Sequence, residues 1–360
     1  YCFINKRIKF IMAYTTINKS TDYFNTKLYT GTGAPQSITG VGHQPDLVWI
    51  KKRAGSTATS HTLTDVVRGV NKQIFTDDTA AEESYTSVLT SFDSDGFSLS
   101  TAGLINASSD TYVAWNWKAG TTSGITTDGN TTITPSSYSF NQTANFSILK
   151  FTGNGVEGAK LAHGLGTTPA MVIIKRTSTT GDWVVYHKNL TATKNLFLNY
   201  TSAETARSPN GYIYSPDATN ITLSNHGDVN NNGVTTVAYC FAEKQGYSKF
   251  GSYTGNGNAD GTFVYTGFKP AFVMIKRAVG GTDNWVIYDN KRIGFNQSNY
   301  NMVANSNSVE NTGIPIDILS NGFKARASEG NTNASGNTYI YMAFAEAPLV
   351  GDNNVPCTAR

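Results

Sequence analysis

One eight-residue pattern occurs three times, and it constrains the fold more than any other feature of the chain. It begins with proline, continues with four or five mostly apolar residues and ends with two cations, at residues 45–52, 169–176 and 270–277. Proline suits the first position of a strand because its φ is fixed and it has no N–H, and Val, Ile, Trp and Phe favour extended backbone. Each copy therefore predicts a short β-strand that follows a turn.

The predicted strand is apolar on both faces. In the first copy Leu47 and Trp49 point to one side, whereas Val48 and Ile50 point to the other. Such a strand has to be covered on both sides. We expect one face to pack on the partner sheet of its own repeat, and the other to meet a loop or a neighbouring repeat.

Two further landmarks recur with this strand. The segment 29–33 is echoed at 151–155 and 253–257, and it predicts a strand end that runs into a hairpin turn. A terminal strand recurs at 113–117, 237–241 and 340–344. Trp117, Phe241 and Phe344 hold equivalent places in it, so each is a predicted core aromatic.

The recurrence predicts three domains of about a hundred residues, each long enough to bury a core. Residues 119–146 are mostly Gly, Thr, Ser and Asn, which is typical of a linker. Residues 79–89 hold the one short helix that we expect. The predicted boundaries are an N-terminal arm at 1–21, repeats at 22–118, 147–246 and 247–348, the linker at 119–146, and a C-terminal tail at 349–360.

Composition indicates the fold class. Only 15% of the residues are charged, 34 are glycine and 12% are aromatic, as expected for short strands joined by many turns. No alternation of strand and helix is present. The sequence predicts an all-β protein of three tandem antiparallel β-sandwich repeats, jelly-roll-like or of another sandwich topology.

Charge and cysteine content exclude several classes of partner. The net charge is +3 and is spread along the chain, so we expect no nucleic-acid partner. No apolar run is long enough for a membrane span, so we expect no membrane insertion. Cys2, Cys240 and Cys357 lie far apart, which predicts reduced thiols in a protein assembled in a cytoplasm. Lys6, Arg7 and Lys9 interrupt any signal-peptide core, and residues 1–11 are read as an extension upstream of Met12.

Two motifs resemble ligand-binding loops. Residues 153–158 match GxGxxG, but the helix that a phosphate site requires is not expected after them, so a hairpin turn is the better interpretation. Asp228, Asn230 and Asn232, followed by Gly233, resemble the start of a calcium loop. The twelfth position is Tyr239 instead of glutamate. This weak metal candidate is therefore interpreted as a polar hairpin tip.

We expect no catalytic residues and no cofactor. The chain has no GxSxG or HExxH motif, and its five histidines have no metal-ligand spacing. Glu243 and Glu346 recur between repeats, but Ala119 takes their place in the first. A pair of carboxylates that recurs with the module is interpreted as structural before it is read as a glycosidase pair.

The cations that end the repeated strand are the charges that we find in all three copies. They are predicted either to contact an anionic glycan or a neighbouring subunit at the surface, or to solvate the strand end and oppose aggregation. Tyr212, Tyr214 and Tyr300 lie in predicted loops and could stack on sugar rings. The possible surface contacts are Lys51, Lys52, Lys175, Arg176, Lys276 and Arg277.

The first repeat resembles a domain of marine tailed bacteriophages, in proteins usually labelled tail-fibre or virion structural proteins. The other two repeats resemble it more loosely, and together they cover most of the chain. The resemblance implies a component of the phage particle and brings no catalytic residues. It is carried by residues 29–33, 38–51, 60–61, 65–69, 94–97 and 112–118.

The resulting hypothesis is a non-enzymatic virion protein, displayed on the particle surface for host attachment or capsid decoration. Its expected partners are other virion proteins of the capsid or tail and a host surface glycan. Three alike domains in one chain predict a pseudo-threefold knob, an extended rod or a homo-oligomer. Two alternatives stay open: a depolymerase that degrades polysaccharide, which needs two facing carboxylates, and a secreted bacterial adhesin, which needs an export signal.

Overall fold

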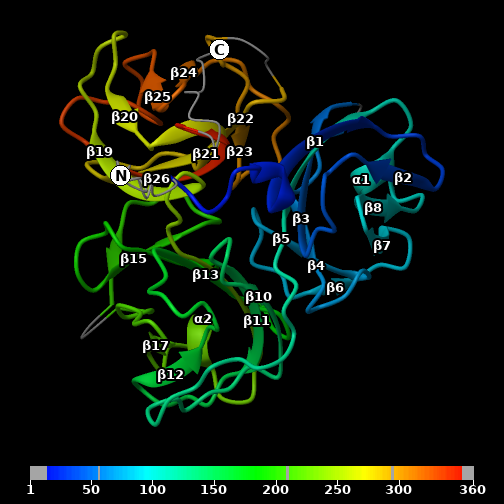
Figure 1. Cartoon of the computed structure of the whole chain (residues 1–360), viewed down its shortest axis with the longest axis vertical. Helices are drawn as coiled ribbons and strands as arrows, with labels where there is room; N and C mark the ends of the chain where they lie inside the picture. Colours follow the sequence, from blue (N-terminus) through cyan, green and yellow to red (C-terminus); the bar gives the residue numbers. More distant parts are fainter. Residues whose placement is uncertain (1–13, 56, 208–210, 293–295, 351–360) are drawn as a thin grey trace, which may run out of the picture.

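The computed structural model describes residues 14–55, 57–207, 211–292 and 296–350. Strands dominate the described chain, the paired strands are antiparallel, and the helices have four residues or fewer. The prediction of an all-β sandwich fold is therefore confirmed. Three lobes surround a common centre, as Figure 1 shows. None of the described helices is long and apolar enough to cross a membrane.

The first module contains a six-stranded and a three-stranded sheet. The large sheet has the order β1 (Phe24–Thr30), β9 (Thr111–Trp117), β3 (Leu47–Ala54), β4 (Thr62–Asp65), β5 (Lys72–Phe75) and β6 (Glu83–Ser84). The small sheet has the order β2 (Gln36–Thr39), β8 (Gly96–Leu99) and β7 (Leu89–Asp93). Two short helices, η1 (Ser20–Asp22) and α1 (Gly103–Asn106), precede β1 and β9.

The second module repeats this order with one strand added at the edge. Its large sheet runs β10 (Ser137–Asn141), β11 (Phe146–Thr152), β18 (Thr235–Phe241), β13 (Met171–Arg176), β14 (Val184–His187), β15 (Lys194–Phe197) and β16 (Thr205–Ala206). The small sheet pairs β12 (Ala159–Ala162) with β17 (Asn220–Leu223), and α2 (Gly227–Asn230) precedes β18.

The third module has the same order again, except that its large sheet ends one strand earlier, with no described equivalent of β6. Its large sheet runs β19 (Ser248–Thr254), β26 (Thr338–Pro348), β21 (Phe268–Val279), β22 (Val286–Asp289) and β23 (Met302–Val303). The small sheet runs β20 (Phe263–Tyr265), β25 (Gly322–Ala325) and β24 (Ile316–Leu319). In each module the strand that carries the repeated pattern, β3, β13 or β21, lies between its terminal strand and the next hairpin strand.

The two apolar faces of the repeated strand have the two covers that we expected. Val48 and Ile50 belong to the core between the sheets of the first module. Leu47 and Trp49 belong to a different core, which all three modules share. The second and third modules divide their apolar residues in the same way between a core of their own and the shared core.

Several local predictions are wrong. Residues 79–89 form no helix, because turns and the short strand β6 occupy them before β7 begins at Leu89. The segment 29–33 is no hairpin, because β1 pairs with β9 in one sheet and β2 pairs with β8 in the other. The chain crosses between the sheets there, and the N–H of Gly33 donates to the carbonyl of Asn106.

The predicted linker and N-terminal arm are also more ordered than expected. Residues 119–146 contain β10, which pairs with β11, and they bury Phe140 and Ala144. Asp46 of the first module accepts hydrogen bonds from the Ala119 N–H and the Ser139 hydroxyl, which ties this stretch down. In the arm, Ile17 is buried in the shared core. Residues 1–11, Cys2 and Cys357 lie outside the described residues.

Candidate functional site

The repeated lysines lie at the junctions between modules. Each ammonium donates one hydrogen bond to a carbonyl of its own module and one to a carbonyl of a neighbouring module. The bonds across the junctions run from Lys51 to Asn307 (2.8 Å), from Lys175 to Thr79 (2.9 Å) and from Lys276 to Thr201 (2.8 Å). The first module thus reaches the third, the second reaches the first, and the third reaches the second, so the three junctions close a ring.

The prediction that these lysines lie at the surface is wrong. Lys51, Lys175 and Lys276 are completely buried, and burial lowers the pKa of each to about 8. The strand ends do not exit to water because the neighbouring module covers them. The alternative interpretation, that these cations contact a neighbouring unit, fits their position, although the unit belongs to the same chain.

The cations that follow the lysines make ion pairs. Lys52 is also buried and pairs with Asp110 at 2.7 Å, so it too is no surface contact. The two arginines are partly exposed and pair with carboxylates of their own modules, Arg176 with Asp228 and Arg277 with Asp283. Because these charges are already neutralised, they offer little to an external anion.

A ring N–H crosses each junction beside the lysine. Trp183 donates to the carbonyl of Phe75 over 2.8 Å, and Trp285 donates to that of Phe197 over 2.9 Å. His61 holds the equivalent place in the first module, and its Nε2 lies 2.9 Å from the carbonyl of Val303. Trp49 donates to His61 Nδ1, so the proton of this neutral imidazole sits on Nε2. Burial lowers the pKa of His61 well below its usual value, which keeps the ring neutral.

A third contact joins the terminal strand of each module to the hairpin of its neighbour. Tyr239 donates to Asp65 Oδ2 over 2.7 Å, and Trp115 donates to Asp289 Oδ2 over 3.1 Å. At the third junction His187 takes the place of the aspartate, and its Nε2 lies 3.2 Å from the carbonyl of Tyr341. Two junctions therefore use equivalent positions, whereas the third uses the backbone carbonyl one residue before Met342, which stands where the other modules carry Trp115 and Tyr239.

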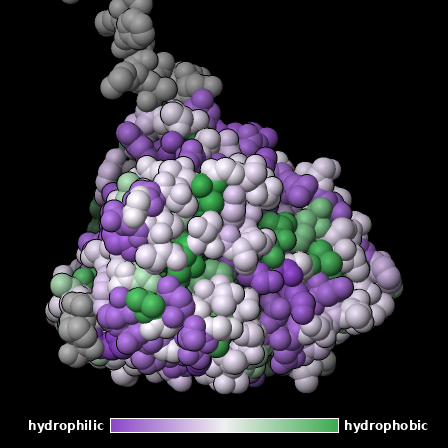
Figure 2. Space-filling model, turned by 90° about the horizontal axis from the view of Figure 1, so that it is seen from below, coloured by the Kyte–Doolittle hydropathy of each residue, from purple (hydrophilic) through white to green (hydrophobic). Residues whose placement is uncertain are grey.

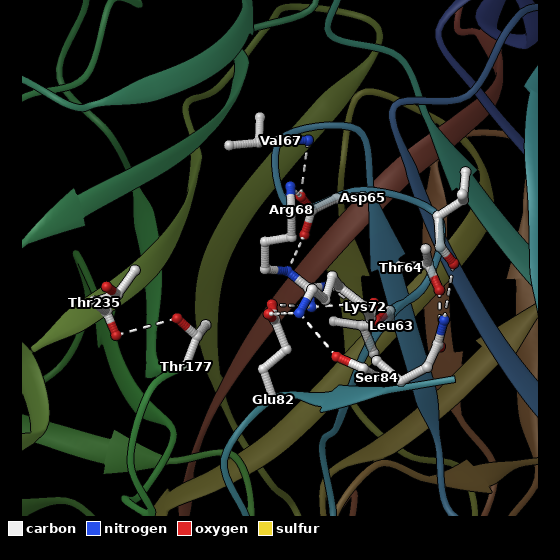
Figure 3. Close-up of polar contacts among 12 residues, drawn as sticks. Leu63, Thr64, Asp65, Val67, Arg68, Lys72, Glu82, Ser84, Thr177 and Thr235 are labelled. Atoms are coloured by element: carbon white, nitrogen blue, oxygen red, sulfur yellow. Dashed lines mark hydrogen bonds and ion pairs between the residues drawn. The ribbon is translucent and has the colours of Figure 1, made fainter. Parts of the chain in front are cut away.

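An arginine holds the acceptor in two of the three modules. Arg68 forms a buried ion pair with Asp65 at 2.5 Å and donates to the carbonyl of Leu63, as Figure 3 shows together with Glu82. Arg292 and Asp289 repeat this arrangement at 2.6 Å. The carboxylate of Asp65 also accepts backbone N–H bonds, so its own module holds it in position for the bond from the neighbouring module.

Sequence reasoning missed a fourth set of junction residues. The backbone N–H of Glu82, Glu204 and Glu310 donates to the carbonyl of Thr177, Ala278 and Arg53 respectively, again across the junctions. The carboxylates of these glutamates form ion pairs with cations of their own modules, namely Arg68, Lys194 and Arg292. A signal was present, because residues 79–82 read TAAE and residues 201–204 read TSAE.

The three predicted core aromatics meet at the centre of the ring. The ring centroids of Trp117, Phe241 and Phe344 lie 5.7 to 6.4 Å apart and contact one another pairwise. Phe24 and Phe272 pack on the same group. Every module thus contributes an equivalent side chain to one aromatic cluster, which makes the shared core continuous across all three junctions.

The weak calcium candidate is not formed. Asp228 pairs with Arg176, and Asn230 Oδ1 accepts the backbone N–H of Asn154. Asn232 is exposed and contributes no converging oxygen. Asn106 and Asn333 repeat the bonds of Asn230, so this amide is a structural device that fixes the glycine turn. No group of three or more His, Cys, Asp or Glu side chains in the described residues could hold a metal ion.

Other ionisable side chains serve the packing. Burial lowers the pKa of His43, His163 and His187 to about 4 and raises that of the Cys240 thiol to about 12. The recurring glutamates pair with lysines, Glu243 with Lys188 and Lys249, and Glu346 with Lys269. These assignments give each of the groups a structural role.

One open cleft of about 620 Å³ lies in the second module. The β14–β15 hairpin and the segment around β17 form its walls. Of the three loop tyrosines singled out in the sequence, only Tyr214 lines it, while Tyr212 packs against His226 and Phe197. Tyr300 is partly buried in the third module. The residues that define the cleft are Tyr186, Leu190, Thr193, Ile213, Tyr214 and Ser215, with Lys188 and Lys194 at its border.

The outer surface is otherwise mixed. In Figure 2 polar and apolar side chains are interspersed on the face that is seen, and the apolar ones form separate small patches. Exposed large apolar side chains in the described residues are scattered over different strands and loops. This pattern is ordinary for a protein surface and indicates no extended apolar docking face on the side shown.

Fold and site together define a class: an all-β protein in which three sandwich modules of one chain close into a ring. A family model, described as a domain of unknown function (DUF7483), matches residues 19–348. The chain belongs to this family. No curated protein and no solved structure matches the chain.

Proposed function

We propose that the chain is a non-enzymatic structural protein of a bacteriophage particle, displayed on its surface for host attachment or capsid decoration. The observation that carries the proposal is the closed ring, in which the same buried contacts recur at all three junctions. The elements that recur in the sequence are therefore used to build a rigid platform. The phage assignment itself rests on the resemblance of the repeats to virion proteins.

The architecture suits a position on a symmetric particle. Heterologous contacts that close after three steps give a ring, and here one chain forms the ring that three subunits would otherwise form. Approximate threefold symmetry allows a single chain to sit where three capsid or tail proteins meet. Because the modules differ in sequence, each can present a different outer surface from a common frame.

The charged groups support a structural role over the competing enzyme. Glu204 and Glu243, beside the cleft, are each paired with a lysine, and Glu204 also accepts two bonds from Thr191. The charge of a paired carboxylate is neutralised by its lysine. A glycosidase instead needs one carboxyl kept protonated as an acid and one free as a base or nucleophile.

The test is to locate the chain in an electron-microscopy map of the virion. Density for a three-lobed ring on the capsid would support decoration, and density at the tail tip would support attachment. Absence from purified virions would overturn the proposal. Release of sugar from host envelopes by the purified protein would favour the depolymerase, and export from uninfected bacteria would favour the adhesin.

A further inference from the structure

We propose that the cleft of the second module binds a neutral saccharide. This inference deepens the attachment form of the proposed function, because it names the ligand class and the module that recognises it. The volume of the cleft, about 620 Å³, lies within the range of 300–1,000 Å³ that is typical of ligand sites. The lining combines aromatic rings, aliphatic side chains and hydroxyl groups on one concave surface.

The cleft offers both kinds of contact that a sugar ring uses. Tyr186 and Tyr214 supply aromatic rings, and Leu190 supplies aliphatic area, for the C–H faces of a pyranose, while Ile213 is buried beneath them. Thr193 and Ser215 are exposed and present hydroxyl groups at the rim. Hydroxyls both donate and accept, so they can match the hydroxyl groups of a saccharide in either role.

Charge in the cleft favours a neutral ligand over an acidic one. Lys188 pairs with Glu243 at 2.8 Å, and Lys194 pairs with Glu204 at 3.1 Å. His187 is buried, and burial lowers its pKa to about 4, so it adds no charge near neutrality. The cations that line the cleft are thus already neutralised by carboxylates, and no excess positive charge is left to attract a sulfate, sialate or uronate.

The other modules handle the equivalent position differently. Tyr288 of the third module is completely buried and donates to the carbonyl of Ile314, and Thr64 of the first is buried and donates to Gln73. Tyr186 is partly exposed at the same position of its strand and faces the cleft. In the second module alone, therefore, this position gives an aromatic ring access to solvent. Folding requires no such opening, since the third module buries a tyrosine there.

The experiment uses the full chain on an array of neutral, sialylated, sulfated and uronate-containing oligosaccharides, with affinities of the hits measured by calorimetry. Tyr214→Ala removes one wall, and Ala192→Trp fills the cleft from its exposed hairpin. Tyr265→Ala is the matched control, because this exposed tyrosine lies in the third module. We expect neutral oligosaccharides to bind, and each cleft variant to weaken binding by about tenfold or more while the control leaves it unchanged.

Several outcomes would overturn this inference. They are a blank array, binding of acidic glycans only, or binding that the two cleft variants leave unchanged. Thermal unfolding of each variant identifies any loss that comes from misfolding, and Ala192→Trp adds bulk without deleting a buried group. Because the location on the virion is measured separately, a blank array with a capsid position removes the glycan site and leaves the decoration role intact.

Discussion

The hydroxyl of Tyr239 in the second module donates a hydrogen bond to the buried carboxylate of Asp65 in the first, over 2.7 Å. Asp65 is held in turn by Arg68, so the tyrosine meets a charge that its own module has already fixed. The bond is charge-assisted and lies in the shared core. It links the packing within one module to the closure of the ring.

Tyr239→Phe tests the strength of this link. The variant leaves the ion pair of Asp65 and Arg68 in place and removes only the bond between modules. We expect the free energy of unfolding to fall by about 1.5–3 kcal/mol, as for a hydrogen bond to a charged group. The control is Tyr253→Phe, which removes a buried bond to the carbonyl of Thr332 within the third module and should cost about 1 kcal/mol. Urea denaturation that gives equal losses for the two variants would contradict the special role of the junction.

The buried lysines predict a rise of stability at alkaline pH. Burial lowers the pKa of Lys175 to about 8, below its value in the unfolded chain. Between pH 8 and about 10.5 the unfolded chain binds a proton that folded Lys175 has released, so this lysine makes folding more favourable as the pH rises. Its contribution between pH 7.5 and 9.5 is about 1–2 kcal/mol.

Lys175→Met should remove this contribution from the pH profile. Cys240 acts in the opposite direction, because burial raises its thiol pKa to about 12, so the difference between wild type and variant is the informative quantity. Lys160→Met is the control, since Lys160 forms a partly exposed ion pair with Asp217. The idea fails if the profiles of wild type and Lys175→Met run parallel from pH 7.5 to 9.5 in denaturant titrations.

His61 predicts a loss of stability in mild acid. Burial lowers its pKa well below 6.5, so below pH 6.5 the unfolded chain takes up a proton that folded His61 does not. The second and third modules carry tryptophan at the position of His61. At the position of Trp49 they carry Ile173 and Met274. The double variant Trp49→Met/His61→Trp therefore imports the pair of the third module into the first.

We expect the double variant to fold and to lose about 2 kcal/mol less than wild type between pH 7 and 5. His61→Trp alone should be less stable than the double variant, because Trp49 would lose the acceptor for its indole N–H. Denaturant melts at both pH values measure the effect. An unchanged acid loss in a folded double variant would show that His61 is not protonated on unfolding as described.

Much of the frame could be predicted from the sequence. The strand at 47–50 is apolar on both faces, and this alone indicates one cover from its own module and another from a loop or a neighbouring module. The pairing of the two sheets could not be predicted locally. The segment 29–33 has the residues of a hairpin turn, but Asn106 fixes it from far along the chain, which makes it a crossover between sheets.

The contacts between modules could not be predicted from the sequence, and the reason is physical. A lysine at the end of an apolar strand is usually solvated, and nothing near Lys51 in the sequence reveals that Asn307 supplies a carbonyl 256 residues away. The segments that lead to Glu82 and Glu204 match as TAAE and TSAE, but the one that leads to Glu310 reads NSVE, so the sequence does not show these glutamates as a threefold set. The cleft depends on whether one tyrosine, Tyr186, is covered, and this is a property of the packing around it.

The buried asparagine of each module predicts a stability effect that is independent of metal. Asn230 donates to the carbonyl of Val156 and to Asn154 Oδ1, and it accepts the Asn154 N–H, so Asn230→Ala leaves several buried groups without partners. We expect a loss of about 2–4 kcal/mol in the free energy of unfolding, from unpaired buried polar groups. Asn232→Ala is the matched control, because Asn232 is exposed, and it should change stability by about 0.5 kcal/mol or less.

Both values should be the same in calcium and in a chelator, measured by chemical denaturation. Stabilisation of the wild type by calcium that either variant abolishes would restore the metal site at Asp228, Asn230 and Asn232 and would contradict the structural role assigned to the amide.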